Sequence, residues 1–166
     1  MSRTIEFPEA LVHISEPDGD LRLVEIERKD PAYFVEVASW RTGYPEHLIE
    51  EILAVKGPAY LCDELKRDED PGYVQASLRH DILGYVSADD LVDGRLLDFG
   101  CGAGASTVIL ARMFPRTRIT GVELVPELAG LSRARARHYG LDNLDIQVSH
   151  APGALPEGSG RSTTSS

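Results

Sequence analysis

Two carboxylates and a glycine-rich turn form the most informative pattern in this sequence. Asp98 lies near the end of an apolar run, and Glu123 ends the next one. Between them are three alternating glycines, Gly100, Gly102 and Gly104. Glycine lacks a Cβ, so such a turn can adopt positive φ and bring its backbone close to a ligand. A helix that begins after the turn would add unpaired N–H groups that attract anionic groups. The pattern therefore predicts a ligand-binding turn between a strand and a helix.

This kind of turn serves two classes of adenosine cofactor. Gly100, Gly102 and Ala105 also satisfy the dinucleotide-binding spacing, and an acid such as Glu123 after the second strand can hold ribose hydroxyls in both classes. Asp98 distinguishes them, because a nicotinamide-binding strand normally has an apolar side chain there, whereas a carboxylate suits a cationic ligand. A nicotinamide-dependent oxidoreductase fragment therefore stays an alternative that Asp98 disfavours.

Simpler interpretations exist for the same residues. The turn could be a tight strand-to-helix connection without a ligand, although three alternating glycines after a strand aspartate make this the minority interpretation. Glu123 alone could be an ordinary surface carboxylate, and only its place after the second strand favours a site. Cys101 lies within the turn, where we expect a small side chain that fills space rather than a nucleophile, because no base is recognisable next to it.

Hydrophobic periodicity predicts the elements that position this turn. From Arg95 onward, short apolar runs alternate with helical patterns. The predicted strands are 96–99, 118–122 and 144–148, and the predicted helices are 105–114 and 126–139. Such alternation indicates βαβ units with a parallel sheet. The fold class is therefore α/β, a Rossmann-like doubly wound parallel sheet of which the first three strands are present.

The N-terminal part has a different texture. Two β-prone segments, 10–14 and 21–27, flank a cluster of turn formers and predict a small hairpin. Residues 45–86 then read as a helical cap. Its helices are 45–56, with an apolar face that includes Val55, then 59–67, and a third with Val74, Leu78, Ile82 and Tyr85 on one face. The predicted domains are 1–90 for the hairpin and cap, 91–157 for the α/β part, and 158–166 for a tail.

The residues LLDFGCGAGAST, followed by ITGVEL, resemble motif I and the acidic-loop motif of class I S-adenosylmethionine-dependent methyltransferases. The resemblance runs from Arg95 to about Pro156 and implies an enzyme that uses S-adenosylmethionine as cofactor. It implies that Asp98 orders the methionine end of the cofactor and that Glu123 holds the ribose. The cofactor-binding turn would consist of Gly100, Cys101, Gly102 and Gly104. The resemblance identifies neither a catalytic residue nor a metal ligand.

Two departures from the family pattern bear on activity. The segment SHAPGALP, residues 149–156, stands in place of a common G-D-A-x-x-L-P pattern and lacks its acidic residue, and we do not assign His150 to the site. The fourth and later strands, which usually hold the acceptor and any catalytic base, do not follow. We therefore expect the front half of a methyltransferase domain, weakly active or inactive as written. A non-catalytic remnant or partner module is the alternative.

The tail, GSGRSTTSS, cannot pack a core. It reads either as a disordered terminus or added tag, or as a frameshifted version of the missing fourth strand. Removing one nucleotide from GC-rich codons for an acidic-aromatic strand yields Arg161 to Ser166 and then a stop codon.

Composition limits the setting and partners. A formal charge of −10 and a pI of about 4.9 argue against a broad phosphate-binding surface, so nucleic acid is an unexpected partner. We expect Arg133, Arg135 and Arg137 to be spread over a solvated helix face. Cys62 and Cys101 show no metal or disulfide spacing, and no signal peptide or long apolar run is present. These features favour a soluble cytoplasmic protein without a membrane partner, whose methyl acceptor, small or macromolecular, is unknown.

Overall fold

The computed structural model describes residues 2–81 and 84–156 and divides into two compact units, Met1–Glu69 and Asp70–Ser166. We call them unit 1 and unit 2. The sequence placed the domain boundary at residues 90–91, whereas this division places the third helix of the predicted cap in unit 2. The predicted tail at 158–166 lies outside the described residues.

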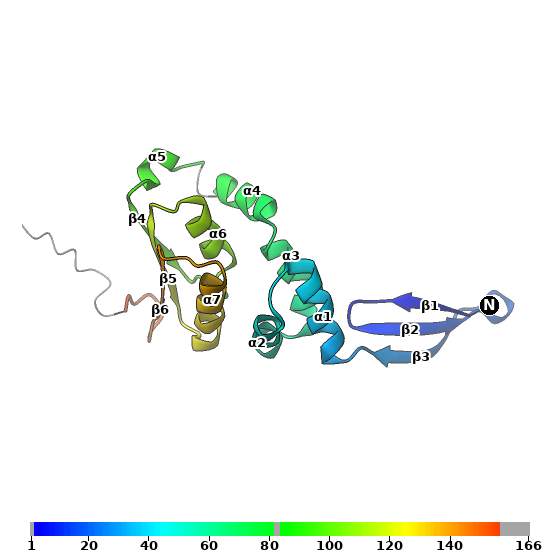
Figure 1. Ribbon diagram of the computed structural model, residues 1–166. Helices are drawn as coiled ribbons and strands as arrows, with labels where there is room; N and C mark the ends of the chain where they lie inside the picture. The colour runs from blue at the N-terminus through cyan, green and yellow to red at the C-terminus, as the bar shows by residue number, and fades with distance from the viewer. Residues whose placement is uncertain (1, 82–83, 157–166) are drawn as a thin grey trace, which may run out of the picture. The chain divides into compact units, whose positions relative to one another are not determined.

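Unit 1 begins with an antiparallel sheet of order β1-β2-β3 (Figure 1). Its strands are β1 (Ser2–Glu6), β2 (Ala10–Ser15) and β3 (Arg22–Arg28), and a short 3-10 turn, η1 (Pro17–Gly19), connects the last two. The predicted hairpin is confirmed as β2 and β3. Strand β1 was not predicted, because the mostly polar segment SRTIE has only one large apolar residue.

A helix that the sequence analysis missed follows the sheet: α1 (Pro31–Thr42). Asp30 caps its N-terminus by accepting from the backbone N–H of Tyr33 at 2.9 Å, and Gly43 ends it with φ 76°. Few of its apolar residues share one face: Phe34 and Ala38 are buried, whereas Trp40 is 83% exposed. The capping residues Asp30, Pro31 and Gly43 were the signal that could have revealed it.

The rest of unit 1 is helical, as predicted. Helix α2 (Glu46–Lys56) buries Leu48, Ile49 and Ile52, whereas Val55, expected on its apolar face, is 39% exposed. A π-helical segment, η2 (Tyr60–Glu64), then continues into α3 (Leu65–Asp68) and corresponds to the second predicted helix.

Unit 2 begins with α4 (Pro71–Asp81), the third predicted helix. Val74 and Leu78 are buried as expected, and Ile82 lies outside the described residues. The prediction was wrong for Tyr85, which lies in a turn beyond the helix and is 87% exposed. The neighbouring Gly84, a poor helix former, lies in the same turn. A short helix, α5 (Ala88–Leu91), follows.

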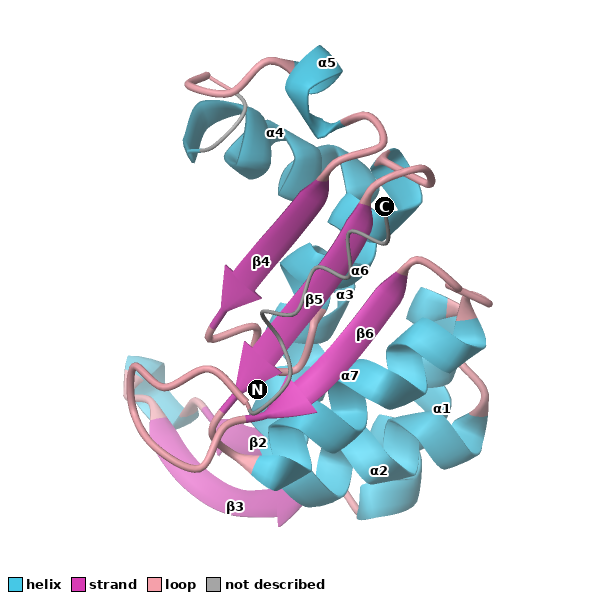
Figure 2. Cartoon of the chain, turned by 90° about the vertical axis from the view of Figure 1, so that its left-hand side faces the viewer, coloured by secondary structure: helices cyan, strands magenta, loops and turns pink. Residues whose placement is uncertain are grey.

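The parallel sheet of unit 2 confirms the predicted α/β fold class. Its order is β4-β5-β6, formed by β4 (Arg95–Phe99), β5 (Arg118–Glu123) and β6 (Leu144–Val148). The connecting helices are α6 (Ala105–Met113) and α7 (Pro126–His138), which lie on the same face of the sheet (Figure 2). All five elements agree with the predicted boundaries to within a residue.

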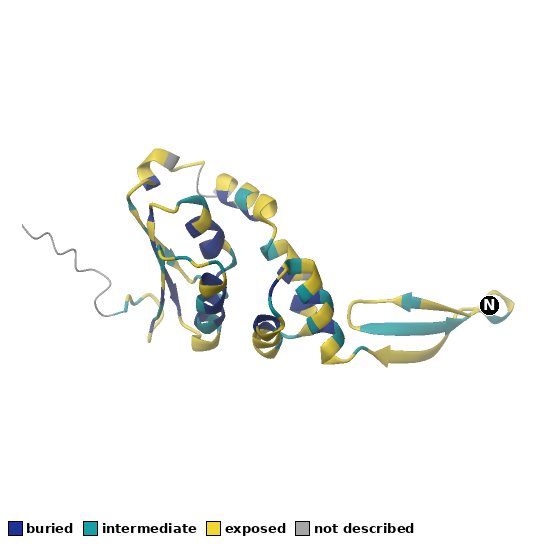
Figure 3. Ribbon diagram, viewed as in Figure 1, coloured by how far each residue is buried: buried dark blue, intermediate teal, exposed yellow. Residues whose placement is uncertain are grey.

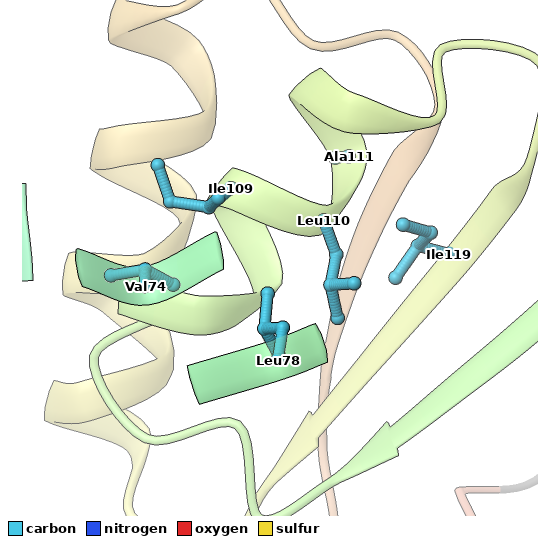
Figure 4. Packing of buried hydrophobic residues seen from close by; sticks show 6 residues of the cluster. All are labelled: Val74, Leu78, Ile109, Leu110, Ala111 and Ile119. Atoms are coloured by element: carbon cyan, nitrogen blue, oxygen red, sulfur yellow. The ribbon is translucent and has the colours of Figure 1, made fainter. Parts of the chain in front are cut away.

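Packing of α4 on α6 forms a core with the helix-facing side of β5. Within unit 2, buried residues gather on α6, α7 and β5 (Figure 3). Figure 4 shows the cluster formed by Val74, Leu78, Ile109, Leu110, Ala111 and Ile119. Leu96 of β4 and Leu144 of β6 pack against it. Burial of these apolar side chains fixes α6 on the sheet and so holds the turn that precedes α6.

None of the helices in the described ranges is long and apolar enough to cross a membrane.

Candidate functional site

The glycine turn connects β4 to α6 and is bonded to the neighbouring strand. Gly100, Gly102 and Gly104 have φ values of 83°, 56° and 83°, in the left-handed region that glycine adopts without strain. The backbone N–H groups of Gly100 and Cys101 both donate to the carbonyl oxygen of Val122, at 2.7 and 3.1 Å. The turn therefore lies at the carboxyl ends of β4 and β5, where open α/β sheets bind ligands.

The three glycines have different surroundings. A Cβ placed on Gly100 or Gly102 would meet no atom within 4 Å, so these two face open space. A Cβ on Gly104 would lie 2.3 Å from the Oγ of Ser132 on α7. Gly100 and Gly102 thus leave room for a ligand against the backbone. Gly104 lets α6 begin directly beside α7.

Glu123 lies next to this turn, at the end of β5. One carboxylate oxygen, Oε2, accepts from the backbone N–H of Gly102 at 2.8 Å. The other, Oε1, accepts from the N–H groups of Leu124 and Val125 at 2.8 and 3.0 Å. Burial tends to raise the pKa of this carboxyl, but the N–H groups of Val125, Gly102 and Leu124 outweigh burial and lower it. The side chain is therefore an anion next to the open turn.

Asp98 is held from the helix side of the sheet. Its Oδ2 accepts from the hydroxyl of Thr107, in the first turn of α6, at 2.5 Å. Thr107 is completely buried, so this contact fixes one carboxylate oxygen between β4 and α6. The structure thus gathers Asp98, the turn and Glu123 around the carboxyl ends of two adjacent strands.

Cys101 is half-buried within the turn. Burial, followed by the negative charges of Asp98 and Glu123, raises the pKa of its thiol to about 11. The thiol therefore stays protonated near neutral pH. This agrees with the expectation that Cys101 fills space rather than acting as a nucleophile.

The predicted solvated arginine face of α7 was wrong for two of its three members. Arg135 is completely buried, and its Nη1 donates to the carbonyl oxygen of Ala103 in the turn at 3.2 Å. Arg133 donates through Nε and Nη2 to the carbonyl oxygen of Ile146 in β6. Only Arg137 is exposed as expected. Spacing by two along a helix places these side chains in different surroundings, and here one of them faces the interior.

Sequence reasoning also missed the residues that support the site: Thr107, Ser132 and Arg135. The position of Thr107 in the first turn of the helix was a usable signal. Nothing in the sequence linked α7 to the turn. His150, which we did not assign to the site, is exposed, whereas its neighbour Ser149 is buried. The Oγ of Ser149 lies 2.8 and 2.6 Å from the carbonyl oxygens of Ala151 and Ala154, which share its single hydroxyl proton. Across the described residues, no cluster of acidic, histidine or cysteine side chains could hold a metal ion.

Comparison with known proteins gives matches among methyltransferases. The family described as "Methyltransferase domain" matches residues 96–162. The release factor glutamine methyltransferase of Vibrio cholerae is 43% identical over 53 residues, which are 32% of this chain and 18% of that protein. The 23S rRNA (uracil(1939)-C(5))-methyltransferase of Edwardsiella ictaluri is 34% identical over 109 residues, 63% of this chain and 23% of that protein. Trans-aconitate 2-methyltransferase of Rhodopseudomonas palustris is 36% identical over 70 residues, which are 42% of this chain and 26% of that protein.

Similar solved structures also include methyltransferases. Geranyl diphosphate C-methyltransferase from Streptomyces coelicolor matches with a TM-score of 0.40 and 24% identity, over 73% of this chain and 50% of that chain. TrmN from Thermus thermophilus matches with a TM-score of 0.40 and 27% identity, over 52% of this chain and 25% of that chain. The chain spans between 18% and 26% of the length of the three relatives described above.

Proposed function

We propose that this chain, in which residues 96–162 form part of a class I S-adenosylmethionine-dependent methyltransferase domain, holds its cofactor at the glycine turn. The observation that carries the proposal is the Glu123 carboxylate bonded to the N–H of Gly102, beside two glycines that face open space. A buried anion next to an open backbone turn suits a ligand with hydroxyl groups and a positive charge. The methyltransferase relatives favour this interpretation over the nicotinamide-dependent alternative.

In this proposal each site residue has one role. Glu123 accepts hydrogen bonds from the ribose hydroxyls. Asp98, fixed by Thr107, orders the methionine end of the cofactor. The turn formed by Gly100, Cys101, Gly102 and Gly104 lets the backbone approach the cofactor. When bound, S-adenosylmethionine supplies an electrophilic methyl group. The chain contributes orientation and exclusion of water, so the proposal requires no strong acid or base.

The acceptor is left open within this function. The names of the relatives include a release factor, a ribosomal RNA and trans-aconitate as objects of methylation, and these differ in chemical class. The activity of the whole protein is part of the proposal, because the chain covers a minor part of each relative. We also propose a reducing, cytoplasmic setting, which is supported by the free thiol of Cys101.

The proposal is tested by replacing each carboxylate with its amide. We expect Asp98→Asn and Glu123→Gln each to weaken binding of S-adenosylhomocysteine by about 1.5–3 kcal/mol, or roughly one to two decades in affinity, because each removes hydrogen bonds to a charged group. Titration calorimetry measures the affinity. Asp90→Asn, which changes an exposed carboxylate on α5, is the matched control and should leave it unchanged. Wild-type affinity in both site variants would overturn the assignment.

A further inference from the structure

Five arginines surround two adjoining hollows in unit 2. The larger, of about 640 Å³, is lined by Arg112, Arg116 and Arg118. The smaller, of about 420 Å³, is lined by Arg133 and Arg137. Gly140, Leu141 and Asp142 line both, so the hollows lie on either side of the turn that precedes β6. We call the five arginines the arginine surface.

The arginine surface is locally positive in an acidic chain. Asp142 and Asp145 are the acidic residues among the described linings of these hollows, while the whole chain carries a formal charge of −10. Arg95 is in register with Arg118 on the neighbouring strand, which adds a further like charge. Like charges directly opposite each other on neighbouring strands are destabilising, so an anion between them would relieve the repulsion.

The arginine surface is held in place by the surrounding structure. The side-chain amide of Asn143 donates to the carbonyl oxygens of Ala111, Phe114 and Thr117 at 3.0, 3.0 and 3.1 Å, which fixes the segment that carries Arg116. The Arg112 guanidinium lies 4.3 Å from the ring centroid of Tyr139. These contacts reduce the conformational entropy that the side chains would lose on binding a partner.

Several guanidinium donors are not used by these contacts. Arg116 engages Asp93 through Nε and Nη2, and Arg133 engages Ile146 through the same two nitrogens, so Nη1 stays available in each. A guanidinium has five N–H donors in a planar fork. Arg118 forms no ion pair with another described residue. Planar donors of this kind match the geometry of phosphate groups.

The arginine surface is separate from the glycine turn. Arg118 begins β5 and Asn143 directly precedes β6, so the larger hollow lies at the amino ends of the parallel strands. The smaller hollow extends from there along β6 as far as Ile146. The turn and Glu123 lie at the carboxyl ends. Strands in a parallel sheet all run the same way. The arginine surface and the glycine turn therefore lie toward opposite ends of the strands.

We propose that the arginine surface binds the phosphate backbone of a nucleic acid. Several guanidinium groups along two open hollows suit a chain of phosphates, each of which can take a bidentate contact. The net charge of the protein argued against a broad basic face, but this surface is local and fixed. It needs no cofactor, so it stands apart from the function proposed above.

The test is fluorescence anisotropy of a labelled single-stranded RNA of mixed sequence, titrated with the full chain over a range of salt concentrations. The double variant Arg112→Gln/Arg118→Gln should weaken binding about tenfold or more at low salt. It should also flatten the plot of log affinity against log salt by about 0.7 for each phosphate that is no longer neutralised. The matched control, Arg22→Gln/Arg79→Gln, removes the same charge from exposed positions outside the arginine surface and should behave as wild type.

Three results would overturn the proposal: no RNA binding at low salt, equal binding by both double variants, or binding of polyglutamate as tight as that of RNA. The first of these results includes the case in which inorganic phosphate binds but RNA does not. S-adenosylhomocysteine affinity, measured on the same proteins, should be unchanged by both double variants. A chain that binds RNA through these arginines but not S-adenosylhomocysteine would contradict the cofactor proposal and leave this one intact.

Discussion

Glu123 combines burial with a negative charge, and its backbone partners explain how. The side chain is 9% exposed, which alone would favour the neutral form. Three backbone N–H groups hold both carboxylate oxygens, and these charge-assisted bonds lower the pKa. The same bonds join the end of β5 to the glycine turn. One carboxylate therefore serves both the stability and the shape of the site.

The charge of Glu123 predicts a pH dependence of stability. Because its pKa is lower in the folded state, its contribution is fully present above the unfolded pKa, near 4.3, and is lost as the pH falls through the folded pKa. The difference in free energy of unfolding between wild type and Glu123→Gln should therefore be constant above about pH 5.5 and shrink in acid. Chemical denaturation at a series of pH values measures it. Glu50→Gln, at an exposed position on α2, should show no such trend, and a matching trend in this control would refute the explanation.

Cys101 carries a prediction of low reactivity. With a thiol pKa of about 11, little thiolate exists near neutral pH. In a Cys62→Ser background, alkylation of Cys101 by iodoacetamide should be much slower than that of free cysteine at pH 8, and its rate should continue to rise as the pH approaches 11. Mass spectrometry follows the modification. A rate that levels off near pH 8 would contradict the raised pKa.

At the scale of elements, the glycine turn is also a packing contact. Gly104 caps α6 at a position where α7 leaves no room for a side chain, whereas Gly100 has the same φ of 83° and open space. The two positions therefore form a matched pair. A side chain would strain the left-handed backbone at both, but it would clash with a neighbour only at Gly104.

Alanine substitutions at these two glycines distinguish the cost of backbone strain from the cost of a steric clash. Gly100→Ala should cost about 1–2 kcal/mol of stability from the left-handed backbone alone. Gly104→Ala should cost more, because its Cβ would also displace Ser132. Urea denaturation measures both variants. Adding Ser132→Gly should recover part of the loss at Gly104 and none at Gly100, and equal losses at the two glycines would rule out the contact.

The elements around the site were predictable and their supports were not. The boundaries of β4, α6 and β5 follow from short apolar runs separated by glycine, signals that are local in sequence. The burial of Arg135 against Ala103 joins residues that are distant in sequence, and side-chain spacing alone does not reveal it. Helix α1 was not predicted because its apolar stripe is weak, although its capping residues are clear. Local patterns thus predict elements better than the contacts between them.

At the scale of the whole molecule, β4 forms one edge of the described sheet of unit 2. Leu97 and Phe99, on the face of β4 opposite α6, are 48% and 46% exposed. Parallel strands are usually covered on both faces, and exposed apolar edges recruit other chains. In the described residues, β4 therefore presents an exposed apolar face at the edge of the sheet.

We expect this edge to cause self-association. The weight-average mass in sedimentation velocity should rise with protein concentration, and Leu97→Lys should reduce that rise, because lysine on an edge strand opposes pairing. Tyr85→Lys changes a residue that is 87% exposed but lies in a turn, and it should have little effect. A wild-type chain that stays monomeric at every concentration would refute the prediction.

The central claim is that the glycine turn and its two carboxylates bind S-adenosylmethionine rather than a nicotinamide dinucleotide. The most direct measurement is calorimetric titration of the purified chain with S-adenosylhomocysteine and, in parallel, with NADH. We predict saturable binding of S-adenosylhomocysteine with one site per chain and no measurable heat from NADH. Binding of NADH without binding of S-adenosylhomocysteine, or of neither ligand to a folded chain, would contradict the account.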